Sequence, residues 1–133
     1  MTNVLKSRKG VTLVELLAVV VILGIIAAIA VPTIGGLISR QQTNADKATY
    51  TQIVEAAKLY AVDDTDGIFT IEDLETDDFI DLKSNTVGMT AGEDEKDLIY
   101  IKVVDGVVTF HSNAAATTLT AVFVNDTEVV KAS

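Results

Sequence analysis

A long apolar run lies within the first third of the chain. Leu16 to Val31 includes no polar side chain, and no charge occurs between Leu16 and Ser39. These 24 residues, at about 1.5 Å each, make a helix of about 36 Å, longer than the roughly 30 Å hydrocarbon core of a bilayer. The pattern predicts a transmembrane helix over residues 11–39.

A periodic pattern comes after this segment. Between Asn44 and Ala61 apolar residues recur every three or four positions, as in a helix with one buried face. The apolar stripe comprises Tyr50, Ile53, Val54, Ala57, Tyr60 and Ala61, and the opposite side comprises Asn44, Lys47, Thr51, Glu55 and Lys58. We therefore expect one long helix whose second, amphipathic half, residues 40–62, packs against a small domain.

Turn-forming residues separate the long helix from the C-terminal part of the chain. The run from Asp63 to Gly67 predicts the end of the helix. Thr70 and Asp73 have the spacing of a capping box, which predicts a short helix extending toward Glu75. The acidic turn 63–67 and the loop from Asp77 to Asp97 are both expected to be exposed, and the domain is expected to fold without a metal.

The C-terminal part has the pattern of strands. Two pairs are expected, joined at Asp105-Gly106 and at Asn125-Asp126-Thr127. The four strands are Leu98–Val104, Val107–Phe110, Thr118–Val124 and Glu128–Lys131, with Leu119, Ala121 and Phe123 on one face of the third. The prediction is an α+β protein in which the long N-terminal helix packs against a small antiparallel sheet within residues 63–133.

Charge is distributed unevenly along the chain. Residues 1–10 have three basic and no acidic side chains, whereas residues 11–133 have seven basic and nineteen acidic ones, a balance of 7 − 19 = −12. Because positively charged flanks stay in the cytoplasm, we expect a single-pass membrane precursor with a cytoplasmic N-terminus and an exported C-terminal domain.

One carboxylate, Glu15, lies inside the apolar region. At the centre of a bilayer an acidic side chain costs about 2.5–3.5 kcal/mol on insertion scales, so Glu15 is expected to have a partner. Cleavage between Gly10 and Val11 would create one, because Val11 would then have a free ammonium group four residues before Glu15.

These residues resemble the N-terminal signal of the type IV pilin and pseudopilin superfamily. A basic leader ends at Lys9-Gly10, Val11 stands where the family usually has Phe, and Thr12-Leu13-Val14-Glu15-Leu16-Leu17 matches its signature. Gly24 and Pro32 also fall at familiar positions. The resemblance covers residues 1 to about 40.

The resemblance implies how the protein is processed and assembled. A prepilin peptidase would remove residues 1–10 by cutting between Gly10 and Val11, and Val11 would be N-methylated. Recognition by the peptidase would involve Lys9, Thr12, Leu13 and Glu15. In a helical homo-oligomeric filament, Glu15 would neutralise the Val11 ammonium of a neighbouring subunit, and Gly24 and Pro32 would allow a helix kink.

Further partners and locations are implied as well. The resemblance implies pilus assembly machinery, minor pilins and the membrane as partners. After assembly the protein would be in an extracellular or cell-envelope filament. The destination is open between a surface pilus, a competence pseudopilus and a type II secretion pseudopilus.

Two other classes of protein are weighed against this interpretation. A cleaved secretory signal would use Ala27-Ala28-Ile29-Ala30, but such a signal does not require an acid in its apolar region. A membrane-anchored binding module that does not polymerise would use its acidic domain to capture a cation or a cationic partner. A plain single-pass anchor is a further alternative, and it too leaves Glu15 unexplained.

Candidate chemistry is scarce elsewhere in the sequence. With one histidine, His111, and no cysteine, neither a histidine-based triad nor a His/Cys metal cluster can form within the chain, so we expect no enzyme activity, metal or cofactor. The acidic turn fails as an EF-hand, because Val62 and Asp73 fall at its first and twelfth positions. The acidic balance also argues against direct nucleic-acid binding.

Overall fold

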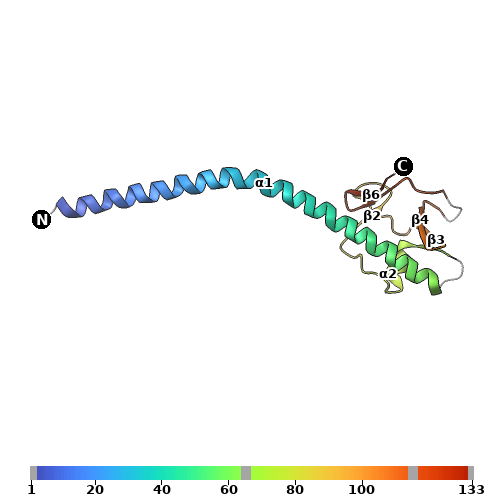
Figure 1. The fold of residues 1–133 in the computed structure, drawn as a ribbon. Helices are drawn as coiled ribbons and strands as arrows, with labels where there is room; N and C mark the ends of the chain where they lie inside the picture. The colour runs from blue at the N-terminus through green and yellow to red at the C-terminus, as the bar shows by residue number, and fades with distance from the viewer. Residues whose placement is uncertain (1–2, 64–66, 114–116, 132–133) are drawn as a thin grey trace. The chain divides into compact units, whose positions relative to one another are not determined.

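The computed structural model describes residues 3–63, 67–113 and 117–131, with backbone alone for residues 3–10 and Lys131 (Figure 1). The chain divides into two compact units, Met1–Gln41 and Gln42–Ser133. One helix, α1 (Asn3–Asp63), begins in the first unit and ends in the second.

The first unit is helical throughout its described residues. Pro32 lies inside α1 and has no N–H to donate to the carbonyl of Ala28, yet the helix continues through it. The next residue supplies an extra hydrogen bond at this turn, because the Thr33 hydroxyl donates to the carbonyl of Ile29 at 3.1 Å. The predicted kink at Gly24 and Pro32 stays a prediction.

The second unit combines two small sheets with the end of α1 and a short helix. In the first sheet, β3 (Tyr100–Val104) lies between β1 (Ile68–Thr70) and β4 (Val107–His111). In the second, β5 (Ala121–Val124) lies between β2 (Val87–Gly88) and β6 (Thr127–Lys131). All neighbouring strands are antiparallel. The predicted α+β architecture is confirmed.

The turn between β3 and β4 is the hairpin that the sequence predicts. Asp105 and Gly106 have φ angles of 52° and 77°, and Val104 is paired with Val107. Two successive positive φ values are typical of a type I′ turn, which favours an acid or amide followed by glycine. The local sequence therefore fixes the register of this strand pair.

The short helix α2 (Ile71–Thr76) begins at the predicted capping box. Thr70 is its N-cap: its hydroxyl accepts from the Asp73 N–H at 3.1 Å, and the Asp73 carboxylate accepts from the Thr70 N–H at 2.7 Å. Two backbone donors that the first turn leaves unpaired are satisfied in this way.

The core of the second unit forms between α1 and the sheets. Phe69, Ile101 and Phe110 are paired across β1, β3 and β4 and are all buried. From α1, Ile53 and Ala57 are buried in the same hydrophobic cluster, and the other residues of the predicted stripe pack against it. The amphipathic prediction for this half of the helix is confirmed.

Two details differ from the sequence-based expectation. Strands β1 and β2 add two strands to the predicted four. The loop from Asp77 to Asp97 is not exposed throughout, because Leu82 and Val87 are fully buried and β2 lies within it. On β5 the predicted alternation is present: Ala121 and Phe123 are half-buried, as Leu119 is before the strand, and Val122 and Val124 are buried.

Candidate functional site

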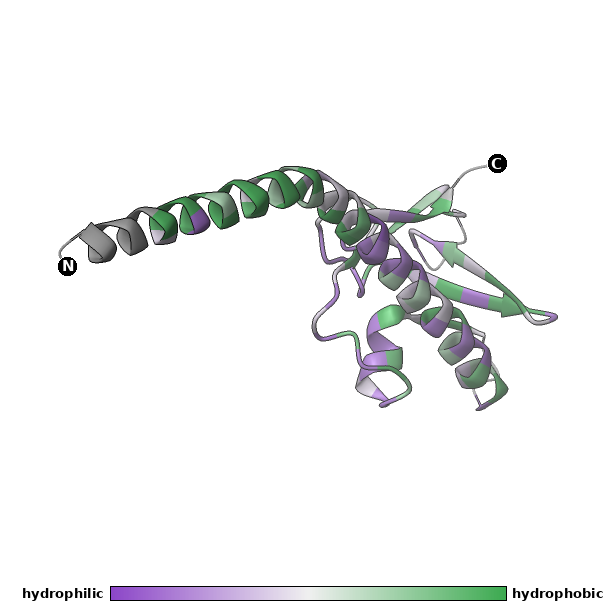
Figure 2. Ribbon diagram, turned by 60° about the vertical axis from the view of Figure 1, so that its left-hand side comes forward, coloured by the Kyte–Doolittle hydropathy of each residue, from purple (hydrophilic) through white to green (hydrophobic). Residues whose placement is uncertain are grey.

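The apolar surface of residues 11–41 lies uncovered. Every large apolar side chain from Val11 to Ile38 is 51–69% exposed. Figure 2 shows this stretch of α1 as almost continuously hydrophobic, and the part after it as mixed. By length and composition alone, α1 is able to cross a membrane. A helix that is apolar all round requires lipid or other protein around it.

Glu15 is the one ionisable side chain in this apolar surface before Arg40. It is exposed on α1, one helical turn after Val11. Residues four apart on a helix are neighbours, so a charge at residue 11 would lie beside the carboxylate. Within the intact chain Val11 offers only a peptide group. A cation at that position requires a new N-terminus, which cleavage after Gly10 would create.

The other predicted signal residues belong to the same helix. Lys9 and Gly10 are helical, and the side chain of Lys9 lies outside the described part of the chain. Val11, Thr12 and Leu13 are exposed. The structure thus presents residues 11–15 as a continuous helical surface, while cleavage, methylation and peptidase recognition stay predictions.

Gly24 has open space around it. A Cβ atom added there would meet nothing within 4 Å, and the same is true at Gly35 and Gly36. Packing within a single chain therefore does not require glycine at these three positions. Their lack of a side chain instead leaves room for close approach by another helix.

The second unit uses its acidic residues to hold its own backbone. Glu75, Asp94 and Glu95 accept hydrogen bonds from the N–H groups of Leu82, Val87 and Met89 at 2.8–3.1 Å. Lys96, whose side chain is 12% exposed, forms ion pairs with Glu75 at 3.3 Å and Asp94 at 3.6 Å. Within the described residues no three His, Cys, Asp or Glu side chains group as metal ligands.

A buried carboxylate that the sequence pattern does not reveal joins α1 to the second sheet. Asp46 is 2% exposed. Its oxygens accept from the Asn125 side-chain amide at 2.7 Å and from the Thr127 hydroxyl at 2.5 Å. Asn125 in turn accepts from the Thr86 N–H at 3.1 Å and donates to Asn85 at 3.2 Å. The network fixes the β5–β6 turn against the helix.

His111 is buried at the end of β4 and is 7% exposed. The Thr109 hydroxyl donates its one proton to the carbonyl of Lys102 at 3.1 Å, so it accepts from His111 Nε2 at 2.9 Å. His111 Nδ1 is buried without a hydrogen-bond partner among the described residues. This environment is structural: the histidine closes the sheet edge next to Thr118.

Comparison with known families identifies the N-terminal segment. The model of the prokaryotic N-terminal methylation motif matches residues 5–31, which is the type IV prepilin-like signal. The motif supports a type IV pilin-like or pseudopilin-like protein. The match includes Gly10, Val11, Glu15 and Gly24 and excludes Pro32. No curated protein and no solved structure matches the chain.

Proposed function

We propose that this protein is the structural subunit of a type IV pilus or a closely related filament. It has no enzymatic role in this proposal. A prepilin peptidase removes residues 1–10, and the mature subunits polymerise through residues 11–39. Competence and type II secretion pseudopili are the alternative destinations within the same class.

A single observation supports this proposal most strongly: Glu15 lies in an apolar helical surface that the chain itself does not cover, one turn after the predicted cleavage position and within the matched segment. An anchor needs the apolar residues but not the acid. A filament core needs both, because neighbouring helices bury the apolar surface and a charge pair in low dielectric favours one axial register over the others.

The order of events depends on the chemistry of Glu15. In the membrane, the Val11 ammonium and Glu15 of one mature chain are one turn apart and partly satisfy each other. During assembly, the ammonium of an incoming subunit pairs with the Glu15 of a subunit already in the filament. The partners required are the membrane, the peptidase, the assembly machinery with minor pilins, and further copies of this chain.

Substitution of Glu15 tests the docking step. Glu15→Gln removes the charge and makes insertion into lipid easier, so membrane levels and cleavage after Gly10 should be normal while filaments fall to few or none. Electron microscopy and sedimentation of sheared filaments measure the outcome. Glu55→Gln is the matched control, because Glu55 is an exposed glutamate of α1 in the second unit and forms a 3.4 Å ion pair with Lys58. Normal assembly of Glu15→Gln would reject charge docking.

Substitution of Gly10 tests the processing step separately. A side chain at this position should block entry of the backbone into the peptidase, so Gly10→Val should leave a full-length membrane protein that retains Lys6, Arg8 and Lys9. Intact-mass analysis of parent and variant measures this directly. A mature parent protein that begins at any residue other than Val11 would remove the prepilin assignment.

The non-polymerising binding module is distinguished by size. We expect detergent-free material from native cells to contain long filaments that are labelled by antibodies to the second unit. Material that sediments only as membrane vesicles, with the chain anchored singly, would favour the binding module.

A further inference from the structure

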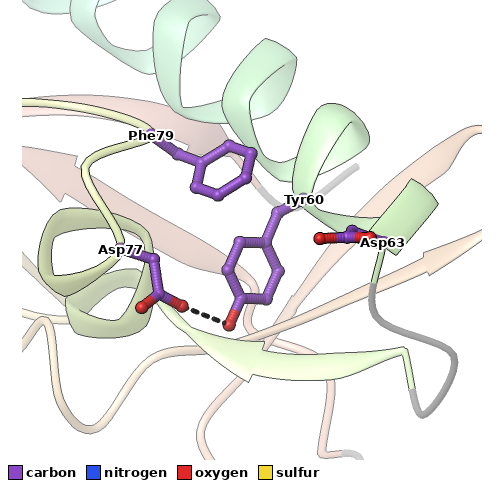
Figure 3. A pocket seen from close by; sticks show the side chains of 4 residues that line it. All are labelled: Tyr60, Asp63, Asp77 and Phe79. Carbon is purple, nitrogen blue, oxygen red and sulfur yellow. Dashed lines mark hydrogen bonds between the residues drawn. The ribbon is translucent and has the colours of Figure 1, made fainter.

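A hollow of about 300 Å³ lies in the second unit where the end of α1 faces the residues after α2 (Figure 3). It is lined by Tyr60, Asp63, Asp77 and Phe79. Its volume is at the lower end of the range for ligand pockets, which suits a small group. Two walls are aromatic and two are acidic.

The aromatic walls form a corner. The rings of Tyr60 and Phe79 have centroids 5.0 Å apart and planes at 75° to each other. Phe69, at 4.6 Å from Tyr60, supports the corner from the core. Phe79 is 37% exposed, although an aromatic side chain of its size is ordinarily stabilised by burial. An edge-to-face corner that is open to solvent offers a negative π surface to a cation.

The end of α2 holds Asp77 and Phe79 in place. The Phe79 N–H donates to the carbonyl of Leu74 at 2.9 Å, and the Asp78 N–H donates to that of Glu75 at 3.3 Å. Asp78, between the two wall residues, has a φ of 59°. This is a Schellman motif, which normally has glycine at the left-handed position. The wall residues are therefore positioned by a rigid helix end.

The two acidic walls, Asp77 and Asp63, lie on opposite sides of the Tyr60 ring (Figure 3). The Tyr60 hydroxyl donates to Asp77 Oδ2 at 2.8 Å, which orients the carboxylate and leaves its second oxygen available. Asp63 and Asp77 form no ion pair with a described residue, whereas Glu55, Glu75, Asp81 and Asp94 do. Acidic residues that serve only to keep a surface soluble need no aromatic rings beside them, whereas Asp63 and Asp77 line the hollow together with Tyr60 and Phe79.

We propose that this hollow binds a primary ammonium group on a short alkyl arm. The ammonium pairs with Asp77, and the arm packs against the rings of Phe79 and Tyr60, while Asp63 adds negative charge on the other side of the Tyr60 ring (Figure 3). A free alkylamine and a lysine side chain of a second copy of this chain share this chemistry. The proposal concerns the second unit alone and does not depend on filament assembly.

Titration of the full-length protein tests the site. The ¹⁵N-labelled chain in maltoside micelles is titrated with n-butylammonium chloride at constant ionic strength, with n-butanol as the uncharged control. A maltoside is needed because phosphocholine detergents contain a competing quaternary ammonium. We expect saturable shifts of the Asp77 and Phe79 amide signals with a Kd on the order of 1 mM, and none with butanol.

Variants separate the walls of the hollow. Asp77→Asn keeps an acceptor for the Tyr60 hydroxyl and should weaken binding about tenfold or more. Phe79→Leu should weaken it by about threefold. Asp105→Asn is the matched control: it removes one exposed carboxylate from a turn where asparagine adopts the same positive φ, and binding should stay within about twofold.

The two sources of the ammonium are separated by protein concentration. Shifts of the same signals on concentrating the protein, lost after lysine acetylation, identify a second copy, whereas shifts only with added amine identify a free ligand. The proposal is overturned if neither n-butylammonium nor concentration gives saturable shifts, if butanol binds equally, or if Asp77→Asn binds as tightly as the parent.

Discussion

Residues 11–41 and residues 42–63 belong to one helix, yet their apolar side chains have opposite surroundings. In the first part every large apolar side chain is at least half exposed, and in the second Ile53 and Ala57 are 1% and 0% exposed. Burying a single Val, Leu or Ile side chain contributes about 1.5–3 kcal/mol. Covering all the exposed apolar side chains of the first part would therefore contribute a free energy on the order of tens of kcal/mol.

The difference lies in pattern rather than in helix propensity. In residues 42–63 most apolar side chains form one stripe that packs in the core of the same unit, and Leu59 and Val62 lie outside it at 63% and 81% exposed. In residues 11–38 the apolar side chains point in all directions, so one small domain is unable to cover them. The second part is therefore completed by its own chain, whereas the first is completed only by lipid or by other helices.

The largest expected effect comes from the same substitution made in each part. Ile53→Ala should destabilise the second unit by about 2–5 kcal/mol, because it leaves a cavity in a closed core. Ile26→Ala, at a residue that is 56% exposed, should change that stability by less than about 0.5 kcal/mol. Urea denaturation in micelles, followed by amide signals of β3 and β4, measures both. Equal effects would mean that the two parts do not differ in how their apolar side chains are covered.

A smaller loss is expected from the buried network. Asp46→Ala leaves the Asn125 amide and the Thr127 hydroxyl without the acceptor they have at 2.7 and 2.5 Å. We expect a loss of about 2–3 kcal/mol, measured in the same denaturation experiment. Glu55→Ala, an exposed acid of the same helix, is the control and should cost less than about 0.5 kcal/mol.

The double variant Asp46→Ala/Thr127→Val isolates the cause of that loss. It removes one of the stranded donors together with the acceptor, so its cost should be less than the sum of the two single costs. Additive costs would indicate that Asp46 acts through packing rather than through hydrogen bonds.

The features that the sequence could predict are set by local rules. The Thr70 and Asp73 capping box, the Asp105-Gly106 turn and the apolar stripe around Ile53 each depend on residues one to four positions apart, and each is confirmed. The N-terminal signal is equally local, and the match over residues 5–31 agrees with its recognition.

The features that the sequence could not predict depend on distant partners. In the sequence Asp46 looks like another polar residue of a solvated helix face. Only its hydrogen bonds with Asn125 and Thr127, which lie 79 and 81 positions further along the chain, make it part of the core. Strand β2 has two residues, too few for any alternation. On β5 both alternating sets are apolar, so the sequence alone does not say which of them, Val122 with Val124 or Ala121 with Phe123, is the buried one.

The smallest expected effect concerns Tyr50, on the covered stripe of the second part. Burial against the domain raises the pKa of this phenol above its ordinary value, and its ring lies 5.7 Å from that of Phe110. The folded state therefore favours the neutral phenol. Its contribution to stability is fully present below the unfolded pKa of about 10 and is lost as pH rises above it.

Tyr50→Phe should consequently reduce the loss of stability of the second unit between about pH 8 and about pH 11, because phenylalanine has no proton to release. Denaturation at several pH values measures the slope, and Tyr100→Phe controls for removing a half-buried hydroxyl at neutral pH. A smaller loss of stability at alkaline pH in Tyr50→Phe is informative, because the charged phenolate of Tyr50 is disfavoured only when the stripe around it is buried. An unchanged alkaline slope in Tyr50→Phe would show that α1 and the sheets separate around Tyr50 in solution, and that this turn of the second part is as open as the first.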